Sequence, residues 1–132
     1  MKVSVDTNVL VRVMLQDDAK QARAAAKLLR EASLIAVPLV CLCELAWVLQ
    51  RGAKLSRGDV SAAIRSLIAT RNVAMNRPAA EAGLAMLDAG GDFADGVMAY
   101  EGHWLGGETF ASFDKQAVDL LTMQGLPARL LP

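Results

Sequence analysis

The stretch that decides the fold is residues 2–15, which read KVSVDTNVLVRVML. Residues 2–6 form a short apolar run that predicts a β-strand ending at Asp6, and the apolar spacing of residues 8–15 predicts a helix directly after it. In folds with parallel sheets, ligands bind outside the carboxyl ends of the strands. This stretch therefore indicates an α/β protein with a candidate site at Asp6.

The same alternation continues to the end of the chain. Further strands are expected at 34–37, 72–75, 108–111 and 128–131. Further helices are expected at 18–32, 38–50, 57–69, 78–89, from 92 to near 106 and at 115–124. Alternation of this kind is typical of a parallel sheet with helices on both faces, so we expect a three-layer α/β/α fold with a short, mainly parallel central sheet. The length of 132 residues predicts a single domain, 1–132.

Composition limits the classes of function. The 14 Lys and Arg residues balance the 14 Asp and Glu residues, so the formal net charge is zero. Any binding of RNA must then depend on a local basic patch and on metal ions. Apolar residues other than Gly make up 54% of the chain, above the usual share of about 45–50% that includes Gly. This excess predicts a further buried surface, such as a homodimer or partner interface.

The cysteines and the first residues predict a compartment. Cys41 and Cys43 are the only cysteines, and their spacing suits neither a disulfide staple nor a complete zinc site. We expect them to be small core residues in a reducing cytosol. The chain begins directly with a strand pattern and has no apolar signal segment. No uncharged apolar run reaches the roughly 20 residues of a membrane span, so we expect a cytoplasmic protein without one.

Five acidic residues lie within or beside apolar runs: Asp6, Glu44, Asp92, Asp95 and Asp114. Such a carboxylate is usually partly desolvated, which costs several kcal/mol unless the charge is paired or coordinates a metal. Only Asp114 has an adjacent basic residue, Lys115. The simplest explanation is that these acids converge on divalent cations.

Their chemistry suits magnesium or manganese, which prefer carboxylate oxygens, and a single His excludes a His-rich zinc site. A metal-dependent hydrolase of phosphate esters is the leading hypothesis. Without metal, mutual repulsion should raise the pKa of at least one of these acids. Two alternatives stay open. One is a phosphatase with Asp6 as its nucleophile, although Asn8 replaces the second Asp of that class. The other is an inactive module that only binds RNA or protein.

Four blocks of the sequence resemble the signature motifs of PIN-domain ribonucleases: VDTNVL at 5–10, ELAWVL at 44–49, DFAD at 92–95 and SFD at 112–114. The blocks occur in the family's order over nearly the whole chain, and they are most similar to the VapC-type toxins of bacterial toxin–antitoxin pairs. The resemblance implies an endoribonuclease of single-stranded RNA that depends on Mg²⁺ or Mn²⁺. It also implies a homodimer that is inhibited by a cognate, VapB-like antitoxin.

The resemblance implies site residues as well. The shared catalytic and metal-binding acids fall on Asp6, Glu44, Asp95 and Asp114. Three polar residues fall on supporting positions: Asn8 after the first acid, Ser112 before the last, and Thr7, for which a ligand contact and a local backbone bond are both open. Asp92 is an additional acid, either a metal ligand or a helix N-cap. Gly96 stands where relatives often have Ala.

Three basic features also have two interpretations each. Arg12 could contact phosphate or a site acid, or it could be solvated or face the antitoxin. Lys115 could neutralise phosphate or be an exposed residue at a helix start. The basic face of helix 18–32 is a solvated surface unless it borders the acidic pocket, where it would guide RNA. Its members are Lys20, Arg23, Lys27 and Arg30.

Overall fold

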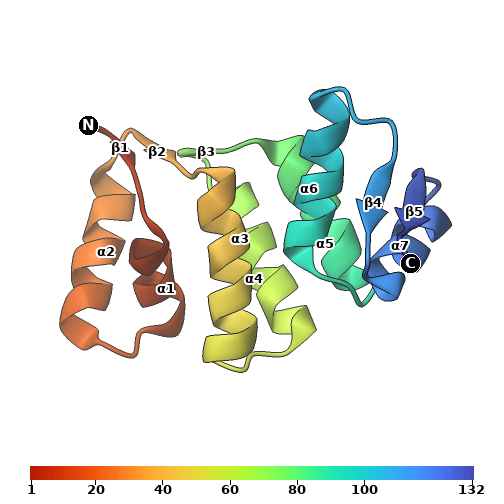
Figure 1. Cartoon of the computed structure of the whole chain (residues 1–132). Coiled ribbons are helices and arrows are strands. Elements are labelled where there is room, and N and C mark those ends of the chain that lie inside the picture. Colours follow the sequence, from red (N-terminus) through yellow and green to blue (C-terminus); the bar gives the residue numbers. More distant parts are fainter. The chain divides into compact units, whose positions relative to one another are not determined.

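The computed structural model describes all residues from Met1 to Pro132, in two compact units (Figure 1). The first unit comprises Met1–Arg77 and the second comprises Pro78–Pro132. None of the helices combines the length and the apolar character needed to cross a membrane.

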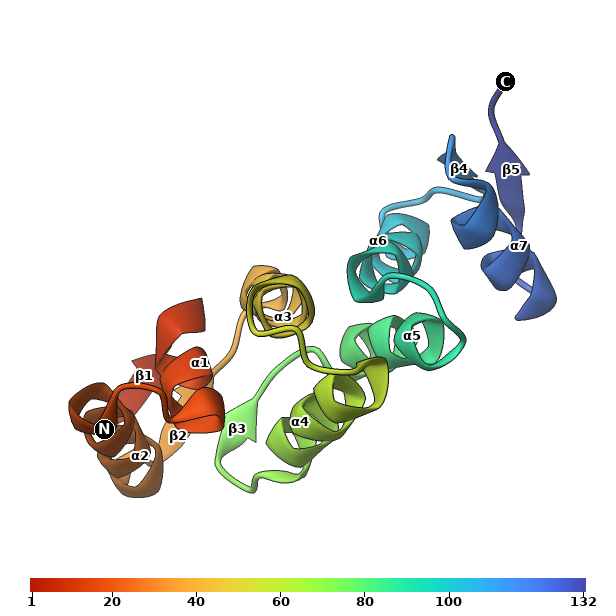
Figure 2. The same ribbon diagram turned by 90° about the horizontal axis from the view of Figure 1, so that it is seen from below.

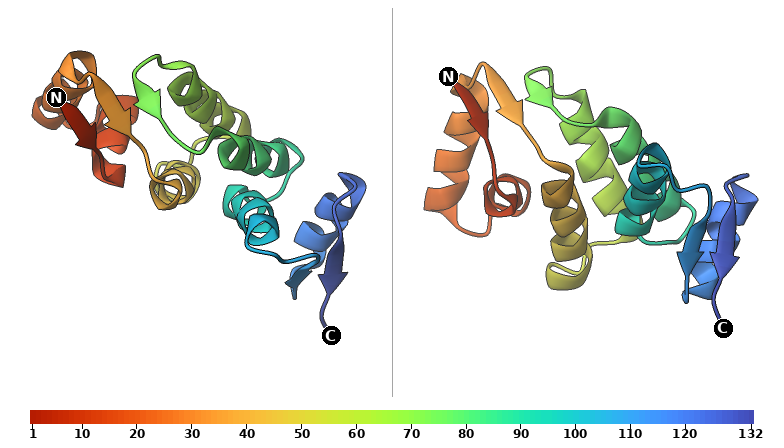
Figure 3. Two further views of the ribbon diagram at one scale, coloured as in Figure 1. Left: turned by 90° about the horizontal axis from the view of Figure 1, so that it is seen from above. Right: turned by 45° about the horizontal axis from the view of Figure 1, so that its top comes forward.

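The first unit contains a three-stranded parallel sheet in the order β1-β2-β3, with its strands side by side in Figure 3. Val3 of β1 pairs with Ile35 of β2, and Ile35 pairs with Val73 of β3. The elements of this unit are β1 (Lys2–Ser4), α1 (Thr7–Leu15), α2 (Ala19–Glu31), β2 (Leu34–Ala36), α3 (Leu39–Trp47), the π-helical turn η1 (Val48–Gly52), α4 (Arg57–Ala69) and β3 (Val73–Ala74).

Local sequence explains where the helices of this unit begin. Asp6, Asp18 and Ser56 are the N-caps of α1, α2 and α4, and each side chain accepts a hydrogen bond from a backbone N–H three residues later. Helices α1 and α2 pack against each other (Figure 2). The central strand residue Ile35 is fully buried, as expected for a parallel sheet covered by helices.

The second unit contains a two-stranded parallel sheet and three helices. Its elements are α5 (Arg77–Asp88, beginning at the boundary), α6 (Phe93–Trp104), β4 (Phe110–Ser112), α7 (Lys115–Met123) and β5 (Ala128–Leu130). Ala111 of β4 pairs with Arg129 of β5. Met86, Ala117 and Leu121 form a buried cluster that packs against residues of α6, α7 and both strands.

The predicted fold class is confirmed: the chain is a mixed α/β protein with seven α-helices and short parallel strands. Every expected element is present, although several ends differ. The first strand ends at Ser4 and not at Asp6, because the side chain of Asp6 caps the following helix. The expected helix 38–50 is α-helical only to Trp47 and then continues as η1. The expected strand 108–111 lies at Phe110–Ser112.

Gly96 allows a close approach of α6 to α5. A Cβ atom at Gly96 would lie 2.4 Å from the carbonyl oxygen of Ala82, which is backbone and cannot move away easily. An Ala side chain at this position therefore does not fit without a shift of the backbone. In contrast, a Cβ atom at Gly102, on the same helix, would meet nothing within 4 Å.

We therefore predict that Gly96→Ala lowers the free energy of unfolding by about 1–3 kcal/mol, the usual cost of overpacking. Gly102→Ala is the matched control, and it should raise that free energy by up to about 1 kcal/mol through helix propensity. Urea denaturation of the two variants measures both effects. A Gly96→Ala protein as stable as the Gly102→Ala protein would contradict the close packing of α5 and α6.

Candidate active site

Two of the candidate acids, Asp6 and Glu44, lie in the first unit. Asp6 follows β1, and its Oδ1 accepts a hydrogen bond of 3.2 Å from the backbone N–H of Val9. Glu44 lies on α3, and its Oε2 accepts a hydrogen bond of 3.0 Å from the hydroxyl of Thr7. The Thr7 hydroxyl therefore donates to a side chain and not to local backbone. Thr7 directly follows Asp6 in the chain, and its hydroxyl orients the Glu44 carboxylate.

These residues border a pocket of about 400 Å³, which we call the acidic pocket. Asp6, Thr7, Asn8, Cys41 and Glu44 are among its lining residues. Burial raises the pKa of the Cys41 thiol. A hydrogen bond with Thr7 opposes this rise, and the negative charges of Glu44 and Asp6 add to it. Cys41 is buried and forms no disulfide, as expected. Its thiol lies close enough to Glu44 and Asp6 for both negative charges to affect its pKa.

Three candidate acids lie in the second unit. Asp92 is the N-cap of α6, and its Oδ1 accepts a hydrogen bond of 3.1 Å from the backbone N–H of Ala94. Asp95 lies in the first turn of the same helix and is half-buried. Burial raises its pKa, and the charges of Asp92 and Asp114 raise it further. This result confirms the prediction that at least one acid has a raised pKa without metal.

Asp114 follows β4 and caps α7, where its Oδ1 accepts a hydrogen bond of 3.2 Å from the backbone N–H of Ala117. The hydroxyl of Ser112 accepts a hydrogen bond of 2.9 Å from the backbone N–H of Asp114. Ser112 thus fixes the turn that presents this acid. Lys115 is occupied elsewhere, because its ammonium group donates to Asp119 at 2.7 Å.

All five candidate acids were expected to be partly desolvated, and only Asp95 is partly buried. The other four acids are exposed: Asp6, Glu44, Asp92 and Asp114. Three of these four are N-caps, where backbone N–H groups and the positive end of the helix stabilise a carboxylate that still faces water. Their position at apolar runs therefore reflects the ends of strands and the starts of helices, and burial is not required to explain it.

The chemistry of the donors fits a hard divalent cation. All five side chains offer carboxylate oxygens, the ligands that Mg²⁺ and Mn²⁺ prefer. None of the five forms an ion pair with Lys or Arg. The pKa of Asp95 is raised first by burial and then by the like charges of Asp92 and Asp114, and a bound cation would compensate those charges. Neither unit by itself brings three His, Cys, Asp or Glu side chains close enough together to hold an ion.

The basic face of α2 lies outside the pockets at Asp6. None of its four basic residues lines the acidic pocket or the second pocket that Asp6 borders. Within the first unit, this face therefore does not border the acidic pocket, where it was expected to guide RNA. Arg12 does line the second pocket, although its guanidinium group is paired with Asp17 and Gln21 rather than with a site acid.

Two structural links were not found by sequence reasoning. The Thr7–Glu44 hydrogen bond joins residues 37 positions apart. The electrostatic effect of Asp6 on the Cys41 thiol depends on the packing of α1 against α3. The spacing of Cys41 and Glu44, three residues apart on one helix, was the only signal in the sequence.

Comparison with protein families gives one match: the model of the PIN domain matches residues 3–118. No curated protein matches the chain. The matched range begins in β1 and ends in α7, so it includes all five candidate acids from Asp6 to Asp114.

Proposed function

The chain belongs to the PIN domain family, and from this membership we propose that it is a metal-dependent endoribonuclease that acts as the toxin of a type II toxin–antitoxin system. PIN domains are generally nucleases and typically use divalent metals. The observation that carries the proposal is a full set of four carboxylates without basic partners, all within the matched range. The match crosses both units, which supports treating 1–132 as one nuclease domain.

We assign metal binding and catalysis to Asp6, Glu44, Asp95 and Asp114, with Mg²⁺ or Mn²⁺ as the cofactor. When bound, such an ion supplies an activated water and compensates the charge on a phosphodiester. The protein contributes orientation. Thr7 holds Glu44, and Ser112 fixes the turn at Asp114. Asn8 has a side chain without an intramolecular partner and is available to a ligand at Asp6.

The proposed role of Asp92 rests on its position as the N-cap of α6. Its Oδ1 already accepts from the backbone of Ala94, and its negative charge contributes to the raised pKa of Asp95. We propose that Asp92 shapes the start of α6 and adds negative potential, with its second oxygen available to a metal-bound water. Single-stranded RNA is the proposed substrate, because unpaired strands expose their backbone and bases to a shallow surface site.

The alternative of an aspartyl phosphatase finds little support around Asp6. That chemistry needs a second acid and a positioned lysine. Position 8 is Asn, and neither pocket that Asp6 borders is lined by a lysine. An inactive binding module is also less well supported, because all four acids of the family pattern are present.

Regulation by an antitoxin is the second part of the proposal. Val40, Glu44 and Trp47 lie at positions i, i+4 and i+7 of α3, which places them on one face of the helix. Val40 is 70% exposed and Trp47 is 65% exposed, although both are apolar. We propose that a VapB-like antitoxin covers this face with an amphipathic segment and directs a basic side chain at Glu44. The high apolar content also supports a homodimer.

We expect that producing the protein in bacteria arrests growth and that co-expression of a small neighbouring antitoxin gene restores it. Trp47→Glu should weaken capture of that antitoxin about ten-fold or more, because loss of a central aromatic contact costs about 2 kcal/mol. Trp104→Glu, which removes another exposed tryptophan, is the control. Light scattering measures the oligomeric state of both variants. Antitoxin capture that is impaired by Trp104→Glu and unaffected by Trp47→Glu would contradict the assignment of α3.

A further inference from the structure

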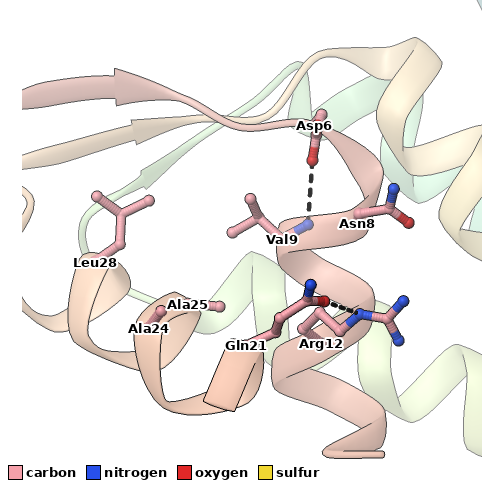
Figure 4. A pocket seen from close by; sticks show the side chains of 8 residues that line it. All are labelled: Asp6, Asn8, Val9, Arg12, Gln21, Ala24, Ala25 and Leu28. Atoms are coloured by element: carbon pink, nitrogen blue, oxygen red, sulfur yellow. Dashed lines mark hydrogen bonds between the residues drawn. The ribbon is translucent and has the colours of Figure 1, made fainter. Parts of the chain in front are cut away.

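A second pocket, of about 370 Å³, lies between α1 and α2 (Figure 4). We call it the α1–α2 pocket. Part of its wall is apolar and consists of Val9 from α1 and of Ala24, Ala25 and Leu28 from α2. The two alanines leave space that longer side chains would fill. The volume is within the range of about 300–1,000 Å³ of small-ligand pockets, so it suits one flat ring system.

Arg12 forms the polar part of this pocket and is held in a fixed orientation. Its Nε donates to Oε1 of Gln21 at 2.7 Å, and its Nη1 donates to Oδ1 of Asp17 at 2.8 Å. Figure 4 shows the Arg12–Gln21 bond at the edge of the pocket. These two bonds use two of the five guanidinium N–H groups, so one N–H on Nη1 and both on Nη2 stay free to donate, and Gln21 keeps its amide N–H groups. The pocket therefore offers several donors in a preorganised arrangement.

The pocket also adjoins the acids. Asp6 and Asn8 line both the α1–α2 pocket and the acidic pocket. A ligand in the α1–α2 pocket would therefore lie beside the first of the proposed metal-binding carboxylates. For a nuclease, the group in that position is a nucleotide next to the scissile phosphate.

We propose that the α1–α2 pocket binds the base of this nucleotide and that Arg12 selects guanine. The apolar wall fits the face of a base, whereas a phosphate there would meet apolar side chains and the charge of Asp6. Arg12 can only donate hydrogen bonds, and guanine presents two acceptors, O6 and N7, on one edge. Adenine presents a donor next to N7, which Arg12 cannot satisfy. The inference rests on the proposed nuclease function.

Binding can be measured without cleavage. Calorimetry or NMR titration of the full chain with guanosine monophosphate and adenosine monophosphate should show a roughly ten-fold preference for guanosine monophosphate, the scale of one bidentate base contact. Arg12→Ala should remove the preference. Arg12→Lys should remove most of it, because an ammonium group cannot keep the planar two-point geometry. Arg23→Ala, on the same helix pair and outside this pocket, is the charge-matched control and should keep the preference.

Melting curves first establish that each variant is folded. Equal binding of the two nucleotides, or an unchanged preference in Arg12→Ala, would overturn the inference. Antitoxin binding that is lost in Arg12→Ala, with both nucleotides bound equally, would also overturn it and assign the pocket to a protein partner.

A cleavage assay separates this inference from the proposed function. Wild-type protein that cuts single-stranded RNA with no preference for guanine, and with the same pattern in Arg12→Ala, would refute the base pocket while the nuclease stands. Binding of guanosine monophosphate through Arg12 without cleavage of any RNA would refute the nuclease while the base pocket stands.

Discussion

Replacing any of the four proposed metal-binding carboxylates by its amide should reduce RNA cleavage about 100-fold or more, the scale for loss of one charge-stabilising group. The four variants are Asp6→Asn, Glu44→Gln, Asp95→Asn and Asp114→Asn. The amides remove the negative charge but preserve size and shape. At Asp6 and Asp114 this design matters, because Asn caps a helix as well as Asp does. Loss of activity would then report on the charge and not on the helix start.

Asp18→Asn is the matched control for this series. Asp18 caps α2 by accepting a hydrogen bond of 3.0 Å from the backbone N–H of Gln21, three residues later, which is the same pattern as the cap at Asp6. It lines neither pocket that Asp6 borders. Asp18→Asn should therefore cleave RNA at the wild-type rate. Full activity in any two of the four site variants would refute the site assignment.

Stability provides a second readout for Asp95→Asn. The folded state raises the pKa of Asp95 above its unfolded value, so the charged form of this acid destabilises the fold. That destabilisation grows as the pH rises through the pKa of the folded state. Asp95→Asn should therefore melt at or above the wild-type temperature near neutral pH. The difference should vanish in acid, where wild-type Asp95 is protonated. A variant that melts lower at neutral pH would contradict the crowding of these acids.

Removal of divalent metal ions by a chelator should also reduce RNA cleavage strongly. Excess EDTA should abolish RNA cleavage, and added Mg²⁺ or Mn²⁺ should restore it, because no basic side chain pairs with the four acids to take the place of a cation. Mg²⁺ should also raise the melting temperature of the wild-type protein, because an ion bound only by the folded state stabilises that state by mass action. At 100 times the dissociation constant, this stabilisation is about 2.7 kcal/mol.

The same titration on Asp95→Asn provides the control, since this variant should show a much smaller rise in melting temperature with Mg²⁺. Cleavage that persists in excess chelator would rule out the metal mechanism. An equal rise in melting temperature for both proteins would show that the ion binds elsewhere.

Much of the fold could be predicted from the sequence because local signals agree with tertiary structure. Asp6 ends an apolar run and begins a helical pattern, and it is the N-cap of α1. Ser56, a residue type that favours N-caps, directly precedes the helix expected at 57–69, and it caps α4 by accepting a hydrogen bond from the backbone N–H of Asp59. These predictions succeed because caps and apolar periodicity involve residues within one turn of each other.

The remaining features depend on packing between elements. The hydrogen bond from Thr7 to Glu44 requires α1 to lie against α3, and no local pattern specifies that distance. The exposure of Asp6, Asp92 and Asp114 could not be inferred from their apolar neighbours, because an acid at a helix start faces solvent even when a nearby residue is buried. The sequence also gives no reason for Gly96 within the expected helix, whereas the backbone of Ala82 leaves no space for a Cβ atom at this position.

Incubation of the purified protein with a circular single-stranded RNA measures endonuclease activity alone, because a circle has no ends for an exonuclease. We expect linear and shorter fragments when Mg²⁺ or Mn²⁺ is present, and an intact circle in EDTA or with Asp95→Asn. A circle that stays intact with a folded, metal-loaded wild-type protein over a range of RNA sequences would refute the proposed endoribonuclease. Equal cutting by Asp95→Asn would contradict it as well.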